Sequence, residues 1–202
     1  MITQTTPLIL GSASPRRRDL LATIGIPFRV VAGAAEEEVR AHEGPAEYLE
    51  RIVADKLVSV AALLDALRFG AVLVADTIVI VDGSILGKPR DERDAAALVG
   101  QLVGRGHEVS TRFAIATPEA PSRIAVARTV TTRVVMRAAT SGEVSRYAAT
   151  GEGLDKAGAY AAQGIGSTFI ERVDGSYPNV VGLPLCEVVV ALRELGLLGV
   201  YP

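Results

Sequence analysis

The stretch AVLVADTIVIVDG, residues 71–83, decides the fold class because it combines a long apolar run with one acidic residue and a turn signal. Valine and isoleucine dominate the run, which is typical of a strand with both faces buried. The dipeptide 82–83, Asp-Gly, predicts a turn. Since Asp76 interrupts the run, we expect two strand-like segments, 71–75 and 78–81.

The carboxyl group of Asp76 needs an explanation, because a lone buried carboxylate is costly. It should pair with a cation, bind a metal, or lie where a strand end opens into a cleft. The alternative is an aspartate whose oxygens are satisfied by backbone amides at a strand break. The residue types alone leave both interpretations open.

The segments on either side of this stretch alternate between strand and helix patterns. Further strands are expected over 8–10, 28–31, 109–116 and 125–136, the last two as a hairpin-like pair. Helices are expected from Pro15 to near Gly25, over 45–69, over 91–103, from Ser141 onward and over 185–197. This order predicts a mixed α/β or α+β fold in which helices pack on one sheet. With no repeat or linker-like stretch, residues 1–202 are expected to form one domain, or one domain with two lobes.

Composition excludes several classes of protein. Nearly half of the residues are apolar and the formal net charge is -2, so the chain has no global basic field for nucleic acid. The apolar runs are too short for a membrane-spanning helix and no signal peptide is evident, so we expect a cytoplasmic protein without membrane or nucleic-acid partners. Cys186 is the single cysteine; we expect a buried small hydrophobe rather than a nucleophile.

The N-terminal segment 12–18 breaks a local rule. Ser14 is a good N-cap and Pro15 suits the first helical position, yet Arg16, Arg17 and Arg18 follow in the first turn. Cations are unfavourable there unless an anion completes the site, because the helix N-terminus already favours negative charge. The segment could cradle a phosphate, or it could be a solvated basic face.

Basic residues elsewhere could complete such a site. Each lysine alone is better explained by solvation, but together these side chains could surround a polyanion: Arg16, Arg17, Lys56, Lys88 and Lys156. Glu36 and Asp76 would then hold the divalent cation that such a substrate brings. Gln163, in a glycine-rich stretch, carries an amide donor and an acceptor that suit reading a base edge; tight turns explain the glycines equally well.

Several known catalytic patterns are missing. Neither histidine has a partner at zinc-ligand spacing, and no P-loop or nucleophile elbow occurs. A hydrolase built on this chain must therefore use metal and carboxylate.

Five ordered motifs, spanning residue 8 to about 195, resemble the Maf family. They are Ser12-Ala13-Ser14-Pro15-Arg16-Arg17 with Leu20-Leu21; Ala75-Asp76-Thr77 with Asp82-Gly83 and Gly87-Lys88-Pro89; Gly104-Arg105 with His107-Glu108-Val109 and Thr111; Asp155-Lys156-Ala157-Gly158-Ala159-Tyr160 with Gln163-Gly164; and Asn179-Val180-Val181-Gly182-Leu183-Pro184. The resemblance implies an elongated mixed sheet with helices forming two lobes around a cleft, similar to the inosine-triphosphate pyrophosphatase architecture.

The resemblance also implies a reaction. Family members cleave a nucleoside triphosphate between the α- and β-phosphates with a divalent metal such as Mg or Mn. Asp76 would accept the proton of the attacking water, directly or with the help of the metal. Phosphate and substrate binding would fall to Ser12, Ser14, Arg17, Lys56, Lys88 and Lys156, and metal binding to Glu36 and Asp76.

Three positions divide the family by substrate. Arg16, Thr77 and Gln163 match the dTTP/UTP pyrophosphatases, whereas a sister group acting on 7-methyl-GTP carries Trp, Gln and Glu there. One departure concerns the loop after the second strand, which has Ala34-Ala35-Glu36 where the family often has Val-Asp-Glu. Glu37 could therefore be the matching acid instead of Glu36.

The resemblance leaves two alternatives to a dTTP/UTP enzyme. One is a relative with another base preference, such as 7-methyl-GTP; the other is a nucleotide-binding regulator of septum formation. Related proteins are often dimers, so a homodimer is one option for this chain.

Overall fold

The structure is a computed structural model that describes residues 1–65 and 67–201. Its sheet has the strand order β2-β1-β3-β5-β6-β7, with β4 paired to β3. The strands are β1 (Leu8–Leu10), β2 (Phe28–Val30), β3 (Ala71–Val81), β4 (Ser84–Leu86), β5 (Gly106–Ala116), β6 (Val126–Met136) and β7 (Ile170–Asp174). The helices are α1 (Pro15–Thr23), α2 (Pro45–Ala61), α3 (Glu92–Gly100), α4 (Ser141–Ala148), α5 (Tyr177–Val181) and α6 (Leu185–Glu194), with short 3₁₀ turns η1 (Ala157–Ala159) and η2 (Ile165–Phe169).

The sheet mixes strand directions. β1 runs parallel to β2 and to β3, whereas β4 runs antiparallel to β3 and β7 antiparallel to β6. The predicted fold class, a mixed α/β sheet flanked by helices, is therefore confirmed.

The expected strand break at Asp76 is wrong. β3 runs without interruption from Ala71 to Val81 and includes both Asp76 and Thr77. Asp76 is buried in this strand. The carboxylate does not need a strand end, because a lysine from another element pairs with it, as described below.

Three helices end earlier than predicted. α2 ends at Ala61 instead of residue 69, because the amides of Leu63 and Leu64 bond carbonyls three residues back and tighten the chain into turns; Ala66, inside the predicted helix, lies outside the described residues. α6 ends at Glu194 instead of 197, because Gly196 takes a left-handed backbone with φ 64° and the Leu197 amide bonds the Leu192 carbonyl, as in a Schellman cap.

The third of these helices, α3, covers Glu92–Gly100 within the predicted 91–103. Asp91 is its N-cap and accepts a hydrogen bond of 2.7 Å from the Asp94 amide. Sequence patterns missed the short elements β4, η1, η2, β7 and α5, which each have five residues or fewer.

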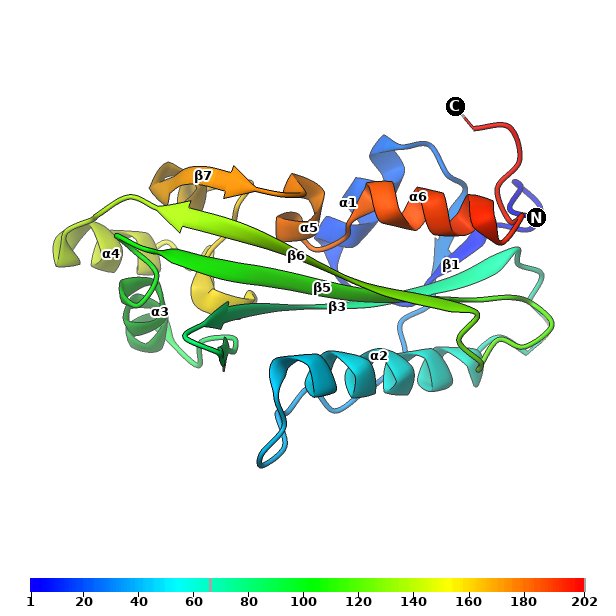
Figure 1. Cartoon of the computed structure of the whole chain (residues 1–202), viewed down its shortest axis with the longest axis horizontal. Helices are drawn as coiled ribbons and strands as arrows, with labels where there is room; N and C mark the ends of the chain where they lie inside the picture. The colour runs from blue at the N-terminus through cyan, green and yellow to red at the C-terminus, as the bar shows by residue number, and fades with distance from the viewer. Residues whose placement is uncertain (66, 202) are drawn as a thin grey trace. The chain divides into compact units, whose positions relative to one another are not determined.

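The chain divides into two compact units. Unit 1 comprises Met1–Asp76, Thr111–Thr129 and Gly182–Pro202. In unit 1, α2 lies on one face of the sheet, and α1 and α6 lie on the other (Figure 1). Its core contains aliphatic side chains of β1, β3 and α2, among them Leu8, Ile9, Leu10, Leu49, Ile52, Leu57 and Leu73.

Unit 2 comprises Thr77–Ser110 and Val130–Val181. Helices α3 and α4 lie side by side in it (Figure 1). Its core is a cluster of valines and other apolar side chains with the aromatic residues Tyr147, Tyr160 and Phe169. That residues 1–202 act as one domain stays a prediction, and Pro202 at its end lies outside the described residues.

The predicted burial of Cys186 is wrong: its thiol is free and exposed. Cys186 follows the first residue of α6, whose buried positions are Val188, Ala191 and Leu192. Those three positions form the inward stripe of the helix, and Cys186 lies outside it. None of the helices formed by residues 1–65 and 67–201 is long and apolar enough to cross a membrane.

Candidate active site

Lys56 holds two carboxylates in unit 1. Its Nζ donates hydrogen bonds of 2.6 Å to Oδ1 of Asp76 and 2.7 Å to Oε1 of Glu37. The side chains of Lys56 and Asp76 are only 13% and 10% exposed, so water screens this pair little. The cluster therefore concentrates two acids around one ammonium group.

The position of Lys56 follows from the pattern of α2. Ile52, Val53, Leu57 and Val60 bury the inner face of that helix. Lys56 lies at the edge of this stripe, so that its aliphatic stem can run along apolar surface while the ammonium group meets Asp76 on β3. Lys56 explains how Asp76 can be buried in an apolar strand, because a buried carboxylate is stable when it is paired and hydrogen-bonded.

Glu37, rather than Glu36, shares the lysine with Asp76. Glu36 is exposed. Tyr48 of α2 donates a 3.3 Å hydrogen bond to the Glu37 carbonyl. Burial, followed by the negative charges of Asp76 and Glu37, raises the pKa of Tyr48, so the phenol stays protonated.

Arg17 is buried close to these acids. Its Nε donates a hydrogen bond of 2.8 Å to the carbonyl of Gly182, and its Nη1 donates one of 3.2 Å to Oγ of Ser12. Burial lowers the pKa of Arg17, and the attraction of Asp76 opposes that effect. Arg17 thus joins the N-terminal motif to Gly182 within the last motif.

The predicted N-cap, Ser14, stands at the start of α1, but its side chain makes no capping hydrogen bond. Instead, the Ser14 amide donates 3.2 Å to Oγ of Ser12. The half-buried Arg16 lies near enough for its charge to lower the pKa of Arg17. Ser12, Ser14, Arg16 and Arg17 therefore form one polar segment at the N-terminus of α1.

The oxygen donors of unit 1 fit a hard divalent cation. Mg²⁺ is commonly held by one or two carboxylates together with substrate phosphates, not by an all-protein cage. Asp76 and Glu37 supply two carboxylates within reach of one ammonium group. In residues 1–65 and 67–201, no group of three or more His, Cys, Asp or Glu side chains could enclose a metal.

The remaining predicted residues belong to unit 2, which begins at Thr77, immediately after Asp76. Lys88 is exposed. Lys156 bonds the carboxylate of Asp155 and the backbone carbonyl of Glu152. The amide of Gly158 donates 3.1 Å to the carbonyl of Gly87, so the two lysine-bearing segments lie side by side.

Gln163 is exposed and precedes η2. The predicted site residues thus fall into two groups. Unit 1 contains Ser12, Ser14, Arg16, Arg17, Glu36, Lys56 and Asp76, and unit 2 contains Thr77, Lys88, Lys156 and Gln163.

Sequence reasoning missed a buried polar pair in unit 2. Nε2 of His107 lies 2.8 Å from the hydroxyl of Tyr160. Burial, with a smaller contribution from Arg105, lowers the pKa of His107 to about 4, so the imidazole is neutral near pH 7. Its position in an alternating apolar strand is the signal that could have placed it in the core.

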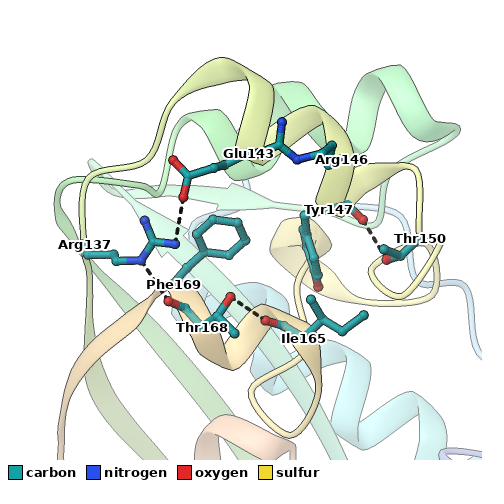
Figure 2. Close-up of a pocket in the computed structure, with 8 residues that line it drawn as sticks. All are labelled: Arg137, Glu143, Arg146, Tyr147, Thr150, Ile165, Thr168 and Phe169. Atoms are coloured by element: carbon teal, nitrogen blue, oxygen red, sulfur yellow. Dashed lines mark hydrogen bonds and ion pairs between the residues drawn. The ribbon is translucent and has the colours of Figure 1, made fainter.

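A separate pocket of about 280 Å³ also lies in unit 2 (Figure 2). It is lined by Arg137, Glu143, Arg146, Tyr147, Thr150, Ile165, Thr168 and Phe169. Arg137 crosses one side and bonds Glu143 at 3.0 Å and the Thr168 carbonyl at 2.9 Å. This pocket contains none of the predicted site residues.

A mixed α/β protein that gathers carboxylates, an ammonium group and a buried arginine has the equipment of enzymes that act on polyanions. Comparison with known proteins identifies the family to which the chain belongs. Residues 7–195 match the model of the family described as Maf-like protein, so the chain belongs to the Maf family.

Individual relatives agree over nearly the whole chain. A protein of Geobacter sulfurreducens named dTTP/UTP pyrophosphatase is 47% identical over 95% of this chain and 97% of its own. One of Hahella chejuensis with the same name is 43% identical over 94% of this chain and 92% of its own. The solved Staphylococcus aureus Ham1 protein gives a TM-score of 0.48 at 13% identity, covering 95% of this chain and all of that one. This last likeness is too weak to establish a shared fold or activity.

Proposed function

We propose that this protein is a nucleoside triphosphate pyrophosphatase that hydrolyses dTTP and UTP to the monophosphate and pyrophosphate. Relatives that carry this name match almost the full chain at 43–47% identity. The structural observation that carries the proposal is the Lys56–Asp76–Glu37 cluster, which places a paired, buried carboxylate beside cationic groups.

In the proposed reaction, a water molecule attacks the α-phosphorus, the bond from that phosphorus to the oxygen bridging the α- and β-phosphates breaks, and pyrophosphate leaves. Asp76 accepts the proton that the water loses. The hydrogen bond from Lys56 holds the Asp76 carboxylate in place. A fixed carboxylate within hydrogen-bond reach of its water is what general-base catalysis requires.

The basic residues bind the triphosphate and stabilise the charge that develops on the leaving pyrophosphate. We assign this role to Arg17, Lys56, Lys88 and Lys156, with Ser12 and Ser14 as further phosphate ligands. Arg17 is already fixed by Gly182 and Ser12. Lys156 is held by Asp155 and the Glu152 carbonyl, and it would exchange these bonds for phosphate.

A divalent cation, Mg or Mn, supplies charge neutralisation of the triphosphate and lowers the pKa of water when it is bound. Asp76 would hold it together with an acid of the loop before α2. Glu37 is the better placed of the two candidates, because it shares Lys56 with Asp76. Glu36, the sequence-predicted ligand, is the adjacent residue.

Base selection is assigned to Arg16, Thr77 and Gln163. Thr77 is the residue after Asp76 on β3. Gln163 is exposed and offers an amide donor and an acceptor, which suit reading a base edge. A cytoplasmic location and a homodimer stay predictions.

Pyrophosphate release from a panel of triphosphates tests this function. The purified protein should hydrolyse dTTP and UTP faster than CTP, GTP or 7-methyl-GTP. Preferential turnover of 7-methyl-GTP would overturn the assignment to the pyrimidine group. Tight binding of dTTP or UTP without turnover, in the presence of Mg²⁺ or Mn²⁺, would favour a regulatory protein instead of an enzyme.

A further inference from the structure

The segment that carries Gln163 is tied down on both sides of this residue. We call residues 161–166 the Gln163 loop. The Ala161 amide donates a hydrogen bond of 3.1 Å to the hydroxyl of Tyr147. The Ala162 carbonyl accepts a hydrogen bond of 3.2 Å from the hydroxyl of Tyr177. The loop is therefore held by side chains from α4 and α5, although Gln163 itself is exposed.

Glu152 closes the other side of the loop. Its Oε1 accepts a hydrogen bond of 2.8 Å from the amide of Ile165, and its Oε2 accepts one of 2.9 Å from the amide of Gly166. Backbone amides that bond a carboxylate make strong, charge-assisted hydrogen bonds. Both oxygens of Glu152 are thus used to fix the backbone directly after Gln163 and Gly164.

Tyr147 links the two sides. It extends from α4 toward Ile165 (Figure 2). Its hydroxyl donates a hydrogen bond of 2.9 Å to Oε2 of Glu152 and accepts a hydrogen bond from the Ala161 amide. One phenol and one carboxylate therefore connect residue 161 to residues 165 and 166. We call this pair the Glu152–Tyr147 clamp.

The loop glycines are required by the clamp. A Cβ on Gly164 would lie 1.9 Å from Oε1 of Glu152, and one on Gly166 would lie 2.7 Å from both the hydroxyl of Tyr147 and the backbone carbonyl oxygen of Ala161. Both distances are far below van der Waals contact. The glycines that flank Ile165 thus let the loop backbone approach the clamp, which gives a specific reason for the Gln-Gly-Ile-Gly sequence.

The clamp is charged near neutral pH. Burial raises the pKa of Glu152, but the hydrogen bonds from Gly166, Ile165 and Tyr147 outweigh burial and place it below the ordinary value. Lys156 adds a favourable charge and bonds the Glu152 carbonyl. Glu152 is therefore a carboxylate that acts as acceptor to the loop.

We propose that Glu152 is a positioning residue for base selection: through the Glu152–Tyr147 clamp it fixes the backbone on both sides of Gln163 and so orients the amide that reads the base. The proposal rests on the proposed function, in which Gln163 contacts the base. It assigns Glu152 and Tyr147 a role in discrimination between nucleotides, without contact to the reacting atoms.

A double-mutant cycle separates positioning from general structural support. The variants are Glu152→Gln, Gln163→Ala and the combination, with Glu171→Gln as control, because Glu171 is an exposed acid of the same unit. The amide of Glu152→Gln has one acceptor oxygen, so one of the two loop amides loses its partner. The measured quantity is the ratio of kcat/KM for dTTP to kcat/KM for CTP.

We expect Glu152→Gln to lower this ratio about tenfold through KM, with kcat for dTTP changed less than about threefold. In the Gln163→Ala background, Glu152→Gln should lower it no further. Multiplicative effects of the two substitutions, or an equal loss of kcat for every nucleotide, would overturn the proposal. If Glu152→Gln does not fold, Tyr147→Phe takes its place in the cycle, since it removes the acceptor of the Ala161 amide.

Hydrogen exchange tests the clamp without turnover. Amides of residues 161–166 should exchange about tenfold faster in Glu152→Gln than in the wild type or Glu171→Gln. Unchanged exchange would overturn the clamp, whatever the activity. If the wild type hydrolyses no triphosphate but the exchange result holds, the proposed function fails and the clamp stands as a structural device.

Discussion

The ammonium group of Lys56 lies 2.6 Å from Oδ1 of Asp76, so the acid in the middle of β3 is one half of a shielded ion pair. The two residues come from different elements, α2 and β3, and are 20 positions apart in the chain. Packing of α2 against the sheet creates this relationship, and the proposed chemistry depends on it.

Removal of the proton acceptor should abolish turnover. Asp76→Asn keeps the size of the side chain but cannot take a proton from water, so we expect kcat for dTTP to fall roughly 10²- to 10⁴-fold. Nucleotide binding, measured by calorimetry, should be partly kept. Asp55→Asn is the matched control, because Asp55 precedes Lys56 on α2 and its side chain is 49% exposed. Unchanged turnover in Asp76→Asn would remove Asp76 from the catalytic role.

Lys56 should be needed for its charge. Lys56→Met leaves the carboxylates of Asp76 and Glu37 without their shared cation, and like charges that lie close together repel each other. We expect kcat/KM for dTTP to fall at least about tenfold, with partial retention in Lys56→Arg. Melting temperatures of both variants separate lost activity from lost folding. Equal activity of Lys56→Met and the wild type would contradict the proposed role.

How much the sequence predicts differs between the two acids of this cluster. Asp76 was recognisable because a carboxylate in an apolar strand breaks the pattern that surrounds it. Glu37 was not distinguishable from Glu36, because consecutive acids in a loop carry no periodicity that tells which one points toward the site. Only the contact with Lys56 decides between them.

The fold, too, is predicted by the sequence only in part. Long elements such as α2 and β5 follow from periodic apolar residues, but the ends of α2 and α6 depend on local turn hydrogen bonds that no periodicity reports. Cys186 was misplaced because residue type predicts average burial, whereas its position on α6 decides the actual exposure. The Glu152–Tyr147 clamp joins a carboxylate to backbone amides 13 and 14 residues away, a relationship that side-chain spacing does not reveal.

The exposed thiol leads to a simple chemical test. Cys186 should react with a thiol reagent in the native protein, at one equivalent per chain, because it is the only cysteine and it is exposed. Modification should leave dTTP hydrolysis intact, since Cys186 has no place in the proposed chemistry. The absorbance of the thiolate that the reagent releases measures the extent of the reaction, and Cys186→Ser is the control. Reaction only after denaturation would contradict the exposed position.

Acid should weaken the start of α4. The Thr140 amide, then Arg137 and the Thr140 hydroxyl, lower the pKa of Glu143 to about 2 from an ordinary 4.5. Because the folded-state pKa is the lower one, this stabilisation is present above 4.5 and is lost as pH falls toward 2. Glu143→Gln should therefore melt at a lower temperature than the wild type at neutral pH, and the difference should shrink in acid. A difference that grows on acidification, measured by thermal scans in matched buffers, would contradict this assignment.

The metal requirement can be tested together with the choice between Glu36 and Glu37. Excess chelator should abolish dTTP hydrolysis, and Mg²⁺ or Mn²⁺ should restore it, because the two carboxylates around Lys56 suit a hard cation that also takes phosphate oxygens. Glu37→Gln should raise the Mg²⁺ concentration for half-maximal activity about tenfold, whereas Glu36→Gln should change it less. The reverse order would return the ligand role to Glu36. Full activity in excess chelator would instead show that the acids of this cluster act without a metal, and that the cations of the site alone stabilise the leaving pyrophosphate.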